Sequence, residues 1–71
     1  MKVTDVMDVV DDAWIVICID RGEEIIEIGQ YDMINHEFPE SILNATVKFV
    51  SGGTVTDNPA FYHESAIFVE I

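Results

Sequence analysis

The feature that most constrains the fold is an apolar run that leads directly into an acidic turn. The run "AWIVICID" (13–20) is rich in β-branched residues and is apolar at odd and even positions alike, which is typical of a central strand buried on both faces. "DRGE" follows it, and Gly22 can adopt a positive φ in a tight turn. "EEIIEIG" (23–29) then predicts the return strand. Together these segments predict an antiparallel hairpin.

Residues 4–12, "TDVMDVVDD", have the pattern of a short amphipathic helix. Its apolar positions follow helical spacing and share one side: Val3, Val6, Met7 and Val10. The aspartates fall on the opposite side: Asp5, Asp8, Asp11 and Asp12. Thr4 is the expected N-cap, and Asp5 in the first turn suits the helix dipole. Valine is a poor helix former, so this helix needs tertiary packing to be stable.

The second half of the chain predicts a short helix and two more strands. "PESIL" (39–43) predicts one or two helical turns ended by an asparagine. "ATVKFVS" (45–51) and "SAIFVEI" (65–71) predict the third and fourth strands. The segment 52–64 between them is either a hairpin extension of both strands or a mobile loop, and its role stays open.

We therefore expect one domain over residues 1–71 with a small α+β fold. It has a four-stranded, mostly antiparallel sheet, with the N-terminal helix packed on one face. One helix covers one face only, so a second apolar surface is expected on the sheet. Its candidate members are Trp14, Val16, Ile25, Val50 and Phe68. The loop "AFYH" (60–63) or a partner molecule would cover that surface.

The net charge of −11 is the outlying property of the composition. It exceeds the magnitude of roughly 2–8 expected for a small domain, and self-repulsion at that density costs stability. Direct binding to nucleic acid or to an anionic membrane is disfavoured. The longest apolar run has seven residues, far fewer than the ~20 of a membrane-spanning helix. No signal peptide is visible, so a cytoplasmic location is expected.

No motif in the chain predicts catalysis or a metal site. "DVMDVVDD" lacks the spacing and the glycine of an EF-hand loop. His36 and His63 do not have the spacing of a zinc motif, and Cys18 lies inside the predicted central strand. "SGGT" is not followed by the lysine of a phosphate-binding loop. The chain is therefore expected not to be an enzyme and to need no metal or cofactor.

The acidic residues are the candidate functional residues. Those of the predicted helix stripe and hairpin form the candidate partner-binding set: Asp5, Asp8, Asp12, Asp20, Glu23, Glu24 and Glu27. Two short ridges of carboxylates on a small domain can imitate the two phosphate ridges of a duplex, which carries one charge per ~1.7 Å of its axis. A basic cleft would then accept the protein. The alternative is that these acids only keep the protein soluble and block sheet edges.

The layout resembles the short acidic proteins that phages and prophages of Gram-positive bacteria encode, the anti-CRISPR proteins above all. It runs from "MKVTDVMDVVDD" through an Ile/Val strand, an acidic turn and a second strand to "PESIL" and an Ile/Val-rich end. The resemblance implies a protein that inhibits a CRISPR effector nuclease in the host cytoplasm, either as a DNA mimic in the DNA-binding cleft or by blocking assembly. The alternative is a small phage accessory or structural domain that homodimerises through an apolar sheet face.

Overall fold

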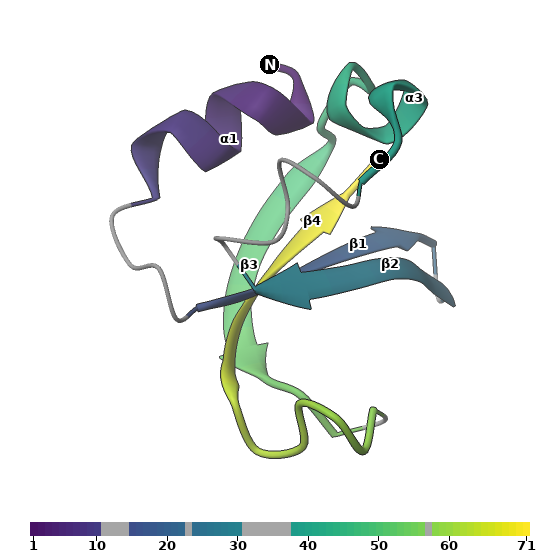
Figure 1. The fold of residues 1–71 in the computed structure, drawn as a ribbon. Coiled ribbons are helices and arrows are strands. Elements are labelled where there is room, and N and C mark those ends of the chain that lie inside the picture. Colours follow the sequence, from purple (N-terminus) through teal and green to yellow (C-terminus); the bar gives the residue numbers. More distant parts are fainter. Residues whose placement is uncertain (11–14, 23, 31–37, 57) are drawn as a thin grey trace.

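The structure is a computed structural model, and it describes residues 1–10, 15–22, 24–30, 38–56 and 58–71. The elements, in chain order, are α1 (Val3–Val9), β1 (Val16–Arg21), β2 (Glu24–Gln30), α3 (Glu40–Leu43), β3 (Phe49–Thr54) and β4 (Ser65–Glu70) (Figure 1). The predicted small α+β fold is confirmed. The predicted helical positions 11 and 12 and the predicted strand positions 13, 14 and 23 lie outside the described residues.

The four strands form one mixed sheet in the order β2-β1-β4-β3. β1 and β2 pair antiparallel as the predicted hairpin, and β3 and β4 pair antiparallel as a second hairpin. The two hairpins join through parallel pairing of β1 with β4, in a register that places Val16 beside Ala66 and Asp20 beside Glu70. β1 and β4 are thus the central strands, and β2 and β3 are the edges.

Helix α1 begins and ends earlier than the sequence pattern predicts. Lys2 is its N-cap, so Thr4 lies inside the first turn and the prediction that Thr4 caps the helix is wrong. The carboxylate of Asp5 accepts a hydrogen bond of 2.8 Å from the Lys2 backbone N–H, which anchors the first turn. Val10 has an extended conformation and caps the C-terminus. β-Branched residues and C-terminal acids both disfavour further helix here.

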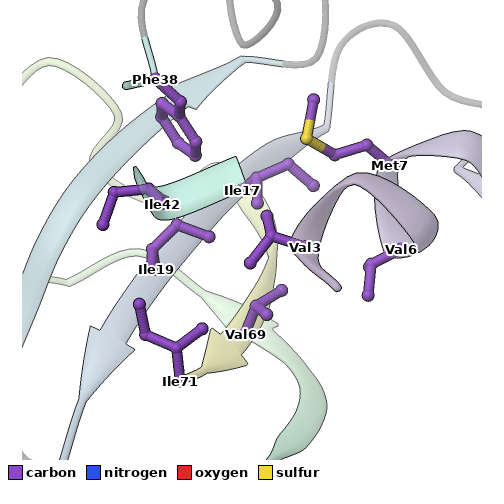
Figure 2. Packing of buried hydrophobic residues seen from close by; sticks show 9 residues of the cluster. All are labelled: Val3, Val6, Met7, Ile17, Ile19, Phe38, Ile42, Val69 and Ile71. Atoms are coloured by element: carbon purple, nitrogen blue, oxygen red, sulfur yellow. The ribbon is translucent and has the colours of Figure 1, made fainter. Parts of the chain in front are cut away.

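One face of the sheet, which we call the helix face, carries α1 and α3 (Figure 1). Ile17 and Ile19 of β1 and Val69 of β4 point to this face, since alternate strand residues point to the same side. Figure 2 shows the core that they form with the two helices. Its buried members are Val3, Val6, Met7, Ile17, Ile19, Phe38, Ile42, Val69 and Ile71. The predicted packing of Val6 and Met7 is confirmed, and Val10 packs at the edge of this core.

The opposite face, which we call the loop face, is covered by the connection between β3 and β4. Val16 and Cys18 of β1 and Ala66 of β4 are buried there beneath Val55, which is 2% exposed. Phe61 of the same connection packs at the edge of this second cluster. The chain itself therefore covers Val16 and Phe68 of the expected second apolar surface, and Phe61 of the "AFYH" segment takes part. Ile25 and Val50 of that expected surface are exposed, and Trp14 lies outside the described residues.

The connection from residue 55 to residue 64 extends the second hairpin. Its backbone bonds join Val55 N–H to the Glu64 carbonyl (3.0 Å) and His63 N–H to the Val55 carbonyl (2.9 Å). His63 adopts a positive φ of 68°. Of the two alternatives for this segment, hairpin extension is therefore confirmed.

Two other segments begin later than predicted. β3 starts at Phe49 instead of at residue 45, because residues 45–47 bond to the start of the chain. Val3 N–H donates to the Ala45 carbonyl (3.1 Å), and Val47 N–H donates to the Met1 carbonyl (2.8 Å). The short helix predicted from "PESIL" is present as α3, with Pro39 as its N-cap and Asn44 as its C-cap.

Candidate partner-binding surface

The β1–β2 hairpin carries one group of acidic residues. β1 ends at Asp20 and Arg21, Gly22 turns the chain with φ 71°, and Glu24 opens β2 opposite Arg21. Glu24 and Arg21 are exposed, and Glu27 is half-buried. Glycine suits this turn because positive φ strains a residue with a Cβ. We call Asp20, Glu24 and Glu27 the hairpin acids.

The carboxylate of Asp20 lies in an unfavourable environment. It is half-buried, and its Oδ1 atom is buried with no hydrogen-bond partner in the described part of the chain. The parallel register of β1 and β4 places Glu70 directly beside it on the same face of the sheet. Like charges opposite one another in a sheet are destabilising. Sequence reasoning missed Glu70, because fifty positions of chain separate it from Asp20.

Helix α1 presents the second group, Asp5 and Asp8, which we call the helix acids. Both are exposed, on the side of α1 away from the buried Val3, Val6 and Met7. Asp5 uses Oδ2 to hold the helix start, which leaves Oδ1 for another molecule. Asp8 lies one turn further along. The helix stripe therefore exists as predicted for these two residues.

The two groups occupy separate parts of the molecule. In Figure 1, α1 and the β1–β2 turn lie at opposite sides of the fold. The helix acids and the hairpin acids therefore do not merge into one continuous ridge. Asp12 and Glu23, the other two members of the predicted set, lie outside the described residues.

The acids are not neutralised within the described part of the chain. The only lysines and arginine of the protein are Lys2, Arg21 and Lys48. Among the described residues, none of these three side chains forms an ion pair with a carboxylate. The exposed acids therefore produce a negative electrostatic potential in the solvent around the protein. This potential decays over a Debye length of about 8 Å at physiological ionic strength.

Comparison of the chain with protein-family models, with curated proteins and with solved structures finds no match.

Cys18 and His63 are the described cysteine and histidine. Burial, together with the nearby negative charge of Asp20, raises the pKa of the Cys18 thiol from 9.0 to about 11, so Cys18 stays protonated at neutral pH. His63 is exposed, and its ring stacks on Tyr62 with centroids 3.9 Å apart. The other histidine, His36, lies outside the described residues.

The potential metal ligands are scattered among the described residues. Nowhere among them do three or more His, Cys, Asp or Glu side chains gather as a metal site. An open hollow of about 250 Å³ lies between β2 and the 55–64 connection, lined by Ile25, Ile26, Glu27, Ile28, Val55 and Asn58. It is smaller than the roughly 300–1,000 Å³ of typical ligand pockets. None of the described helices has the length and apolar character needed to cross a membrane.

Proposed function

We propose that this protein is a stoichiometric inhibitor that binds the basic cleft of a nucleic-acid-processing enzyme, such as a CRISPR effector nuclease. The observation that supports this proposal is the exposure of Asp5, Asp8 and Glu24 on a domain of net charge −11, in which the lysines and the arginine form no ion pair with any of the described acids. A protein that needed acids only for solubility could balance part of that charge with its own lysines and arginines.

The inhibitor acts by offering carboxylates where the enzyme expects phosphates. Lysine and arginine side chains in a DNA-binding cleft form charge-assisted hydrogen bonds to carboxylate oxygens as they do to phosphate oxygens. The hairpin acids lie on two paired strands, β1 and β2, and β1 is central to the sheet. Side chains that are held on paired strands lose less conformational entropy on binding than side chains of an unpaired segment.

The adjacent carboxylates of Asp20 and Glu70 also favour a positively charged partner. Two adjacent carboxylates, one with a buried oxygen that has no hydrogen-bond partner among the described residues, are unfavourable in the free protein. A cationic side chain from a partner would relieve that repulsion. Binding would then recover free energy that the free protein loses at this position.

Three single charge reversals of equal size test the proposal. Glu24→Lys changes the hairpin acids and Asp8→Lys the helix acids, while Glu64→Lys is the matched control in the 55–64 connection; all three positions are exposed. Binding to a guide-loaded CRISPR effector nuclease is measured by titration with and without target DNA. Glu24→Lys is expected to weaken binding several-fold to roughly tenfold and to slow association. The effect of Asp8→Lys shows whether α1 takes part.

The proposal also predicts how binding responds to salt and to target DNA. Affinity falls steeply as salt rises, and target DNA competes with the inhibitor. Circular dichroism must show that all three variants keep the parent fold. If Glu24→Lys and Asp8→Lys bind and inhibit as well as the parent, or weaken binding no more than Glu64→Lys, the acids serve solubility and the proposal is wrong.

A further inference from the structure

The two edges of the sheet differ in how they are protected against pairing with another strand. β2 carries Glu24 and Glu27, and its register with β1 is irregular between Ile19 and Asp20. Charged residues and irregularities are the usual devices that prevent edge-to-edge association. β2 is therefore a blocked edge.

β3, the other edge, has neither device. All six of its residues, "FVSGGT", are exposed. The stretch from Phe49 to Thr56 contains no charged residue, and at eight positions it is the longest charge-free stretch of the chain. Phe49 is 71% exposed and Val50 49% exposed, and they point to opposite faces of the sheet. In a molecule of charge −11, this uncharged strand repels a second negative molecule less than β2 does, because β2 carries two glutamates.

We propose that two copies of this chain associate through β3, which pairs antiparallel with β3 of the second copy around a twofold axis at Ser51. The two four-stranded sheets would then form one continuous eight-stranded sheet. Of the hairpin acids, Glu24 and Glu27 lie on β2, at the opposite edge of the sheet from β3, and Asp20 lies on the central strand β1, so none of them belongs to this surface.

Symmetry restricts the possible registers of this pairing. A twofold axis between antiparallel strands stands normal to the sheet, so each residue must oppose one that points to the same face. With the axis at Ser51, Phe49 opposes Gly53 of the second copy and Val50 opposes Gly52 of the second copy. Moving the axis by one residue, to Val50 or to Gly52, shifts the register by two residues and loses both matches.

The two glycines are suited to receive these side chains. A Cβ on Gly52 would meet no atom within 4 Å, so the space beside it is open for Val50 of the second copy. Above Gly53 lies the half-buried ring of Phe68, 3.1 Å from where a Cβ would be. Phe49 of the second copy would reach the edge of that ring, and aromatic pairs of this kind add to the area buried. Projecting residues and open positions on one strand make it complementary to itself, which favours a second copy over an unrelated partner.

Salt separates this association from the proposed enzyme binding. Two molecules of like charge repel, so added salt should strengthen self-association, whereas it should weaken binding to a basic cleft. We would measure molecular mass by sedimentation equilibrium from about 10 μM to about 1 mM protein, a range chosen for a small interface. We expect a dimer whose dissociation constant falls as the salt concentration rises. A monomer at every concentration and salt would overturn the proposal.

Ser51→Lys tests the position of the axis. It places two like charges directly opposite each other, so the dimer dissociation constant should rise at least tenfold. This rise is expected although each copy becomes less negative and the two copies therefore repel each other less overall. Ser41→Lys, at an exposed position of α3, is the control with the same charge change, and it should not weaken the dimer. A dimer that withstands Ser51→Lys would refute pairing at this strand.

Ser51→Cys tests the register directly. Opposed residues of antiparallel strands have Cα atoms about 4.5–5.5 Å apart, within the range of a disulfide. Mild oxidation should therefore cross-link Ser51→Cys much faster than Ser41→Cys, and the native Cys18 is buried and does not compete. Equal cross-linking of the two variants would contradict the register. Failure of these tests leaves the enzyme-binding proposal untouched, because the acids lie outside β3.

Discussion

Ile17→Ala is expected to remove a large part of the stability of this domain. Ile17 is 0% exposed on the central strand β1, and it packs between Val3 and Met7 of α1 and the rest of the helix-face core (Figure 2). The substitution deletes three carbon groups, which at ~0.8 kcal/mol each amounts to about 2.4 kcal/mol of lost transfer free energy. The cavity left behind raises the cost to roughly 3–4 kcal/mol.

That cost is large for a chain of 71 residues. Domains have roughly 0.05–0.15 kcal/mol of stability per residue, or about 4–11 kcal/mol here. At roughly 4–8 °C per kcal/mol, the melting temperature should fall by more than about 12 °C.

Ile25→Ala is the matched control, because it makes the same chemical change at a side chain that is 37% exposed on the edge strand β2. Its cost should stay near or below ~1 kcal/mol. Urea unfolding followed by far-UV circular dichroism measures both variants, with similar m-values expected. If the two substitutions cost the same, Ile17 does not occupy the core position that the structure assigns to it.

Three further predictions follow from local contacts. Asp5→Ala should cost about 1 kcal/mol in urea unfolding, because it removes the bond to the Lys2 N–H and a favourable first-turn charge. Asp8→Ala, at the end of the helix where a negative charge opposes the dipole, should be neutral or stabilising, and equal losses would argue against the anchoring role of Asp5. Gly22→Ala should cost about 1 kcal/mol because φ is 71°, and Gly22→Asn should cost less; a neutral Gly22→Ala would contradict that turn geometry. The unfolded Cys18 thiol loses its proton near pH 9.0 and the folded thiol only near 11, so this group should lower the free energy of unfolding by up to about 3 kcal/mol as pH rises from 9 to 11. Cys18→Ala should lack that part of the alkaline loss, and identical pH profiles for the two proteins would refute it.

The sequence predicted the local elements because their causes are local. The turn in "DRGE" needs a glycine at positive φ, and Gly22 supplies it. The run 13–20 before it is apolar at both odd and even positions, which predicts a strand buried on both faces. β1 is such a strand. Proline and asparagine bound the short helix α3 as their backbone preferences require. The exposure of Asp5, Asp8 and Glu24 follows from the same periodic patterns.

Element boundaries depended on contacts that no local pattern records. β3 begins at Phe49 because residues 45–47 bond to Met1 and Val3, more than forty positions away. α1 ends at Val9, although the apolar spacing continues to Val10. A helix end reflects a balance of small terms, and here weak valine propensity outweighs one more apolar contact.

Tertiary structure alone decided how the two hairpins join and what the surface offers. Parallel pairing of β1 with β4 makes β3 a free edge and sets Glu70 beside Asp20. Each hairpin forms from neighbouring segments, but their junction spans almost the whole chain and is selected by burial of the shared core on both faces. The charge of −11 was fixed by composition, whereas its separation into helix acids and hairpin acids arose from where α1 packs on the sheet.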